Sequence, residues 1–164
     1  MIEIIKMKSD KSYFGGKVRT RVCGLCFKDD KILLVKHNMD GQYFYSPPGG
    51  AVEFGESMHS ALAREFKEET NLEIEIGKQL FISEHLKPPL HAIEIFFKIN
   101  KWAGKLITGT DPEIDRDNFI LDVDFYSYKA IKRIANKNLH HILHNCNNPR
   151  ALLAFSGFIS PPLN

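Results

Sequence analysis

The segment from Gly50 to Leu72, GAVEFGESMHSALAREFKEETNL, constrains the fold and the chemistry of this chain more than any other part. Three of its carboxylates, Glu65, Glu68 and Glu69, are spaced i, i+3 and i+4, so on a helix they share one face. Three like charges on one face repel each other, and a bound cation is the natural reason to keep them together. Hard oxygen ligands of this kind suit Mg²⁺ or Mn²⁺.

Local signals predict a loop followed by a helix over residues 57–70. The run before it, residues 46–50, holds two prolines and two glycines and cannot lie inside a helix. Ser57 is a good N-cap residue. One apolar stripe follows from the spacing of Met58, Ala61, Leu62 and Phe66, with the three glutamates largely off it. Asn71 suits the left-handed position that ends a helix, and Leu72 can then fold back onto the stripe.

This segment resembles the signature of the Nudix hydrolases, in which a Gly, a Glu, an Arg-Glu pair, a Glu-Glu pair and an aliphatic residue follow at fixed intervals. The matching positions are Gly50, Glu56, Arg64, Glu65, Phe66, Glu68, Glu69 and Leu72. Asn71 stands where the family has Gly, and we expect a local cost of about 1 kcal/mol without loss of chemistry. The resemblance implies an α/β fold, a Nudix-like α/β/α sandwich with a central mixed β-sheet flanked by helices.

The resemblance also implies an activity and the residues that carry it. Nudix enzymes hydrolyse a pyrophosphate bond in a nucleoside diphosphate linked to another moiety X, and divalent cations neutralise the diphosphate oxygens and hold the attacking water. The implied metal ligands are Glu56, Glu65, Glu68, Glu69 and the backbone carbonyl of Gly50. Arg64 would pair with a glutamate of this set and orient it. A salt-bridged, solvated helix explains the charges too, but not the Gly-rich loop ahead of it.

Among Nudix enzymes the general base is a Glu of the helix in some members and a Glu on a loop nearer the C-terminus in others. Residues 101–117 form a long predicted loop, and loops of that length are often functional. Glu113 on this loop is the predicted base, with Asp111, Asp115 and Glu94 as alternatives. The other interpretation of Glu113 is a turn residue in solvent.

Basic residues near the N-terminus are candidates for substrate contacts. Arg19 and Arg21 alternate with Lys17 along a predicted strand and share a face, which suits substrate phosphates or an adenine-ribose end. A solvated edge-strand face is the alternative. Lys36 ends the strand that leads to the Gly-rich loop and is a second phosphate candidate. Gly49 and Gly50 of that loop complete the predicted substrate-binding set.

The identity of X depends on residues outside the signature. ADP-ribose pyrophosphatases tend to carry a Pro sixteen residues past it, and Pro88 stands sixteen after Leu72, which favours ADP-ribose or a nucleotide sugar. A turn shaped by Pro88-Pro89 is the alternative. Other functions on the same fold are a hydrolase that sanitises nucleoside triphosphates, a nucleotide-sensing module and an isoprenoid diphosphate isomerase. The retained glutamates argue against a sensor, and no upstream motif clearly supplies the Cys and Glu of an isomerase.

Composition sets the broad class. The 164 residues, 43% hydrophobic and 26% charged, predict an N-terminal arm over residues 1–16 and a single globular domain over 17–164. A net charge of +2 is too small to predict binding to nucleic acid. No run reaches membrane-spanning length, and the N-terminus lacks the apolar core of a secretory signal. We therefore expect a cytoplasmic protein whose partner is a nucleotide-type small molecule.

Cys23 and Cys26 form a C-x-x-C pair within an apolar, strand-like run. On a strand they would point to opposite faces, so buried reduced thiols are predicted, and a redox or zinc pair is the alternative. Cys146 makes the cysteine count odd.

The remaining pattern predicts the order of elements. Strands are expected over residues 17–27, 31–37, 43–46, 73–76, 79–85, 91–98 and 119–126, and a second helix over 128–145. Few polar positions in 91–98 suggest a central place in the sheet. Strands and helices in this order suit a mixed sheet between helices.

Two features of the C-terminal region carry alternatives. His140 and His144 have the i, i+4 spacing of a metal pair, with His141 beside them, but no third ligand is evident and a solvated helix face is predicted. The apolar tail, residues 151–159, is predicted to pack on its own domain as a strand or short helix. An arm that crosses to the partner of a homodimer is the alternative.

Overall fold

The structure, a computed structural model, describes residues 16–39, 41–87, 90–110, 119–144 and 146–161. The predicted N-terminal arm up to residue 15 lies outside the described residues. So do Pro88 and three of the candidate bases, Asp111, Glu113 and Asp115.

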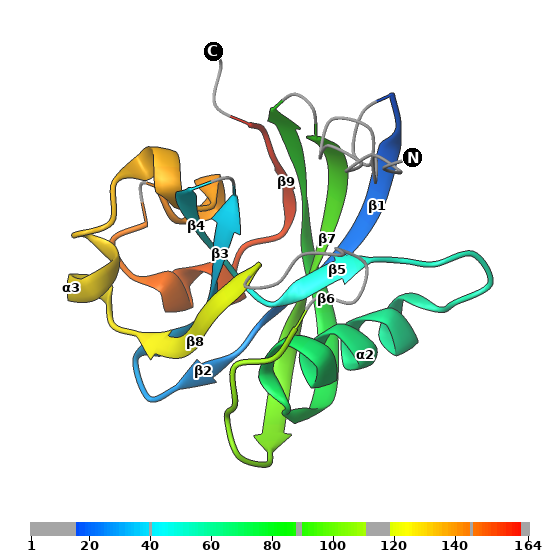
Figure 1. The fold of residues 1–164 in the computed structure, drawn as a ribbon, viewed down its shortest axis with the longest axis horizontal. Coiled ribbons are helices and arrows are strands. Elements are labelled where there is room, and N and C mark those ends of the chain that lie inside the picture. The colour runs from blue at the N-terminus through cyan, green and yellow to red at the C-terminus, as the bar shows by residue number, and fades with distance from the viewer. Residues whose placement is uncertain (1–15, 40, 88–89, 111–118, 145, 162–164) are drawn as a thin grey trace, which may run out of the picture.

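Within the described residues, the longer sheet has the strand order β5-β1-β7-β6-β9. Its strands are β1 (Val18–Leu25), β5 (Gly49–Ala51), β6 (Glu73–Lys87), β7 (Leu90–Ala103) and β9 (Gly157–Ile159). β1 pairs antiparallel with β5 but parallel with β7, so the sheet is mixed. The central place predicted for residues 91–98 is confirmed, because β7 lies between β1 and β6 (Figure 1). The strands predicted over 73–76 and 79–85 are one strand, β6, with irregular register between Glu75 and Phe81.

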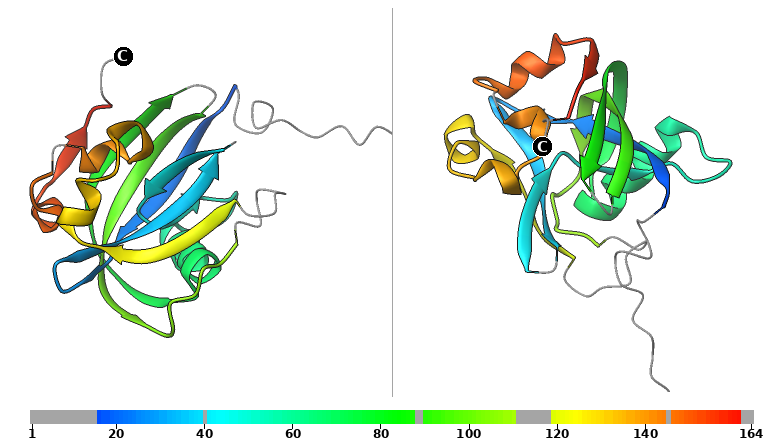
Figure 2. Two further views of the ribbon diagram at one scale, coloured as in Figure 1. Left: turned by 60° about the vertical axis from the view of Figure 1, so that its left-hand side comes forward. Right: turned by 90° about the horizontal axis from the view of Figure 1, so that it is seen from above.

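The second sheet is built around β3 (Lys31–Met39). Its other strands are β2 (Phe27–Lys28), β4 (Gln42–Ser46) and β8 (Ile120–Tyr126), each antiparallel to β3. Only Cys26 separates β1 from β2, so the chain passes directly from one sheet into the other. Figure 2 shows the two sheets as separate groups of strands, β1, β6 and β7 in one and β3, β4 and β8 in the other.

Helix α2 (Met58–Thr70) begins and ends where the local signals predict. The Ser57 hydroxyl oxygen accepts a hydrogen bond from the Ser60 N–H at 3.1 Å and so caps the first turn. Asn71 takes the left-handed conformation, with φ 60° and ψ 13°, and its N–H donates to the Lys67 carbonyl. The predicted tolerance of Asn at this position is therefore seen in the backbone.

The apolar face of α2 packs on strands of both sheets. The shared core contains Val22, Cys26, Leu33, Val35, Ala61, Leu62, Phe66, Leu72, Phe97, Ile99, Ile120 and Val123. Full burial of Leu62 and Phe66 contributes roughly 1.5–3 kcal/mol each. Gly24 on β1 lets the Phe66 ring approach, since a Cβ there would overlap the ring. Met58, predicted as part of the apolar stripe, is 44% exposed instead.

The long second helix predicted over residues 128–145 is wrong. The segment forms one helical turn, α3 (Tyr128–Ile131), and two short 3-10 turns, η1 (Asn136–Asn138) and η2 (His141–Leu143). Between them Leu139 forms a bridge to Tyr45, and the His140 N–H donates to the Tyr45 carbonyl at 2.9 Å. These contacts with β4 hold the chain extended, and they override an apolar spacing already weakened by asparagines.

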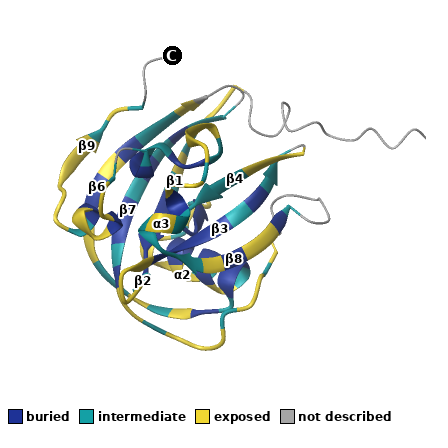
Figure 3. Ribbon diagram, turned by 90° about the vertical axis from the view of Figure 1, so that its left-hand side faces the viewer, coloured by how far each residue is buried: buried dark blue, intermediate teal, exposed yellow. Residues whose placement is uncertain are grey.

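The C-terminal segment covers the other side of the long sheet. Ile131, Leu139, Ile142, Leu143 and Leu152 form a second core with Cys23, Leu25, Ile32, Leu34, Leu80, Phe81 and Phe96. Buried positions accordingly run along the strands between α2 and this segment (Figure 3). The predicted α/β class, with a central mixed sheet and a helix packed on it, is confirmed.

The tail folds back on its own chain. After η3 (Pro149–Leu153), β9 pairs in parallel with β6, as predicted for a strand packed on the parent domain. Cys23 and Cys26 are free and buried, one in each core, which confirms reduced thiols on opposite faces. Burial raises the pKa of the Cys26 thiol to about 12. Among the helices that the structure describes, none is long and apolar enough to cross a bilayer.

Candidate functional site

The Gly-rich strand β5 lies directly against the carboxylates of α2. The Gly49 N–H donates to Glu69 Oε2 at 2.9 Å. A Cβ on Gly50 would overlap the Glu65 carboxylate, and a Cβ on Gly49 would overlap the backbone of β1. Gly49 has φ +149°, a conformation that favours glycine. Both glycines are therefore required by close approach, and Gly50 leaves the Glu65 oxygens next to the main chain.

Arg64 lies at the centre of the carboxylate cluster. Its Nε and Nη2 donate to the two Glu56 oxygens at 3.0 and 3.1 Å, a bidentate pair. Its Nη1 donates to Glu65 at 2.9 Å and Glu68 at 3.3 Å, and Nη2 also donates to the Ala51 carbonyl at 3.0 Å. The hydrogen bonds from Arg64 lower the pKa of Glu56 below its ordinary value. The pairing predicted for Arg64 thus extends to three glutamates and the end of β5.

The two carboxylates nearest β5 are taken out of solvent. Glu65 is 4% and Glu69 is 2% exposed, whereas the Glu68 side chain is 28% exposed. Buried carboxylates are costly unless paired or bound to a cation. With the space left by Gly50, this oxygen-rich donor set fits Mg²⁺ or Mn²⁺.

Arg21 supports the Gly-rich strand from the opposite side. Its Nη2 donates to the Gly49 carbonyl at 2.9 Å, and its Nε lies 3.6 Å from Glu94. Glu94 is 5% exposed and lies 2.7 Å from His140 Nε2. Burial alone would raise the pKa of Glu94, but His140 and Arg21 outweigh it and lower that pKa to about 2. Glu94, an alternative general base in the sequence, is thus enclosed behind β5.

The other predicted substrate contacts are spread over both sheets. Arg19 is half-buried on β1, two residues from Arg21. Lys36 lies on β3 of the other sheet, with its ammonium 4.2 Å from the centre of the Tyr43 ring. The structure therefore brings Arg21 to Gly49 but places Lys36 on a separate element.

The chain leading toward Glu113 runs along the end of α2. The Gly109 N–H donates to the Glu69 carbonyl at 2.9 Å, and the Thr110 N–H to the Glu68 carbonyl at 3.1 Å. Glu113 itself lies outside the described residues.

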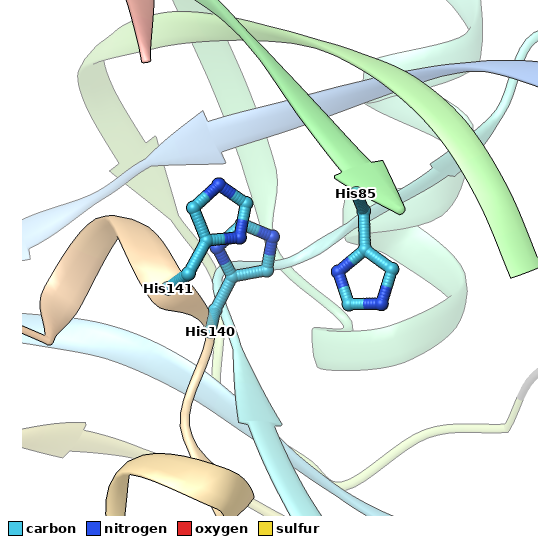
Figure 4. Close-up of side chains that lie close together, drawn as sticks. All are labelled: His85, His140 and His141. Carbon is cyan, nitrogen blue, oxygen red and sulfur yellow. The ribbon is translucent and has the colours of Figure 1, made fainter. Parts of the chain in front are cut away.

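The histidines near residue 140 do not form a solvated helix face, so that prediction is wrong. His140 is 2% exposed, and His144 Nε2–H donates to the Leu139 carbonyl at 2.7 Å, outside any regular α-helix. The histidine that joins His140 and His141 is His85 at the far end of β6 (Figure 4). No local sequence signal links His85 to residues more than fifty positions later.

Comparison with known proteins gives consistent results. Residues 17–145 match the NUDIX domain family. An ADP-ribose pyrophosphatase of Methanocaldococcus jannaschii is 39% identical over 117 residues, which cover 70% of this chain and 64% of that protein. The NAD-capped RNA hydrolase NudC of Edwardsiella ictaluri is 29% identical over 107 residues, 65% of this chain and 38% of that protein. The matches thus span less than two thirds of either relative.

Solved structures share the fold at low sequence identity. The crystal structure of a MutT NUDIX hydrolase from Burkholderia pseudomallei superposes with a TM-score of 0.63. It is 18% identical in sequence, and the match covers 84% of this chain and 97% of that one.

Proposed function

Because the chain belongs to the NUDIX domain family, we propose that it hydrolyses a pyrophosphate bond in a nucleoside diphosphate linked to another moiety, with ADP-ribose as the first candidate substrate. The observation that carries the proposal is the carboxylate cluster of α2 held against Gly49 and Gly50. The identity of 39% to an ADP-ribose pyrophosphatase supports the choice of substrate.

The proposed metal ligands are Glu65, Glu68 and Glu69, with the Gly50 carbonyl beside them. A divalent cation bound there would neutralise diphosphate oxygens and supply a water for attack at phosphorus. Glu56 accepts from Arg64 with both oxygens, so we assign it a ligand role through water. Arg64 orients Glu65 and Glu68, and it is a positioning residue in this scheme.

The remaining roles come from the sequence. Glu113, three residues beyond Thr110 in the sequence, is the proposed general base. Arg19 and Lys36 are proposed contacts for the substrate phosphates, while Arg21 acts through Gly49. A homodimer and a cytoplasmic location stay predictions.

NAD-capped RNA is a second candidate substrate. NudC, 29% identical to this chain, is named for that activity, and the cap shares an adenosine diphosphate group with ADP-ribose. Nucleoside triphosphates, the substrates of a sanitising hydrolase, form the third class to be compared.

The test is a substrate panel of ADP-ribose, nucleotide sugars, NADH, NAD-capped RNA and nucleoside triphosphates, assayed with Mg²⁺. Glu69→Gln should lower kcat/KM for the preferred substrate by at least about 100-fold, roughly 3 kcal/mol, because it removes a ligand charge. Glu73→Gln is the matched control, since Glu73 is an exposed carboxylate just past α2. The proposal would be overturned if the protein hydrolysed no compound of the panel, or if Glu69→Gln kept full activity. Chelation of Mg²⁺ should abolish activity and its return should restore it.

A further inference from the structure

Three histidines from distant parts of the chain meet behind the Gly-rich strand. His85 comes from the end of β6, and His140 and His141 come from the start of η2. One ring nitrogen of each lies within 4.8 Å of the others. The His140 and His141 rings are stacked at 4.7 Å, and the His85 ring faces that pair (Figure 4). None of these residues belongs to the carboxylate cluster of α2.

Hydrogen bonds fix the proton on His141. Its Nε2 lies 2.7 Å from Ser83 Oγ, and that hydroxyl also donates to the Ile159 carbonyl at 3.2 Å. A hydroxyl has one hydrogen, so Ser83 must accept from His141 Nε2–H. The Nδ1 atom of the neutral ring then carries a lone pair.

His140 is held by a buried carboxylate. Its Nε2 lies 2.7 Å from Glu94, and both side chains are almost completely buried. A carboxylate hydrogen-bonded to a histidine is the usual companion of a metal-binding imidazole, because it orients the ring and raises its basicity. With Nε2 held by Glu94, Nδ1 is the His140 ring nitrogen left to bind a metal, and it accepts only a long hydrogen bond of 3.5 Å from the Ile142 N–H.

We propose that His85, His140 and His141 bind a transition-metal ion of the zinc class, with Glu94 orienting His140 through their hydrogen bond. Three imidazoles, with the fourth position left to water, are a ligand set that tetrahedral Zn²⁺ takes. They select against Mg²⁺, which prefers oxygen ligands, so this site and the α2 carboxylates bind different ions. The site joins β6, β7 and the C-terminal segment, and it lies beside a cavity of about 410 Å³ that His141 lines.

The experiment uses tag-free, metal-stripped protein in millimolar Mg²⁺, which occupies the oxygen-rich cluster. Titration with Zn²⁺ by calorimetry should show one tight equivalent, and Co²⁺ should give the visible absorption of a tetrahedral nitrogen-rich site. Zn²⁺ should also raise the Tm, because it binds only the folded state. His85→Gln and His141→Gln should each weaken Zn²⁺ binding by at least about 100-fold.

Two controls separate this site from its neighbours. His144→Gln, in the same segment but outside the cluster, should bind Zn²⁺ like the wild type. Glu69→Gln should also retain Zn²⁺ binding while losing hydrolysis, so the failure of one proposal is distinguishable from that of the other. The proposed zinc site would be overturned if His85→Gln and His141→Gln both bound Zn²⁺ with wild-type affinity. It would also be overturned if Glu69→Gln lost Zn²⁺ binding. X-ray absorption of the Zn²⁺-loaded wild type, which needs no variant, should show imidazole scattering, and oxygen ligands alone would contradict it.

Discussion

At the scale of single residues, two arginines hold the Gly-rich strand from opposite sides. Arg21 donates to the Gly49 carbonyl and Arg64 to the Ala51 carbonyl, so the carbonyls on both sides of Gly50 are fixed. The Gly49 N–H in turn holds Glu69. The position of Glu69 thus depends on the Arg21 guanidinium, which fixes the Gly49 residue whose N–H holds the Glu69 carboxylate.

Arg21→Lys tests this dependence. A lysine keeps the charge but not the planar group that reaches both Gly49 and Glu94. We expect kcat to fall about 10-fold, near 1.4 kcal/mol, with a higher Mg²⁺ requirement and little change in the KM for substrate. Steady-state kinetics at varied Mg²⁺ measure both. A rise in substrate KM at unchanged kcat would instead show Arg21 to be a direct phosphate contact.

His37 makes stability depend on pH. Burial, together with the charge of Arg21, lowers the pKa of His37 to about 3 from an ordinary 6.5. Between these values the unfolded chain binds a proton that the folded chain does not, so stability falls as pH drops from about 6.5 toward 3. The slope is at most about 1.4 kcal/mol per pH unit for this group. His37→Gln should flatten urea-unfolding free energies measured from pH 7 to 4, and an unchanged slope would refute this.

At the scale of elements, helix α2 is defined by its two ends. Its Ser57 cap and its left-handed Asn71 follow from local rules, which is why the sequence predicts them correctly. The Asn71 side chain adds a hydrogen bond to the Lys105 carbonyl at 3.0 Å, which ties the helix end to the chain after β7.

Asn71→Ala should destabilise the protein without changing its chemistry. Alanine in the left-handed region costs about 1–2 kcal/mol, and the bond to Lys105 is lost as well. We expect the free energy of unfolding in urea to fall by about that amount, with kcat near the wild-type value. Asn71→Gly, which restores the conformational freedom of glycine, should stay within about 1 kcal/mol of wild type. Equal stability of the alanine variant would show that the cap is not strained.

Elements whose conformation depends on contacts with distant residues could not be predicted from the sequence. Residues 128–145 have helical spacing, yet the bridge from Leu139 to Tyr45 pulls them out of a helix. The enclosure of Glu94 and the approach of His85 to His140 likewise arise from strand pairing across the sheet. The α2 carboxylates were predictable because their spacing lies within one helix, whereas a site assembled from β6, β7 and η2 leaves no local pattern.

At the scale of the whole molecule, the long sheet ends in two short strands, β5 and β9. Ending the chain after Ser156 removes β9 and uncovers the edge of β6 that it pairs with. We expect the Tm to fall by about 5–10 °C and the protein to self-associate as its concentration rises. Calorimetry and light scattering measure these effects. Because β5 lies at the opposite edge of the sheet, the kcat of the folded fraction should stay at the wild-type value. As a control, a chain ending after Pro161 should have the Tm and the self-association of the wild type.

The position of β1 has a consequence for how the protein is made. β1 is the first described strand, but its neighbours are β5 and β7, and β7 ends only at Ala103. A chain growing from the ribosome therefore exposes the apolar run from Val22 to Cys26 until most of its length has been synthesised. Pairings between such distant segments form slowly and leave aggregation-prone surface uncovered meanwhile. Its yield in a cell should accordingly depend on chaperones that shield nascent chains more than on the stability of the finished fold.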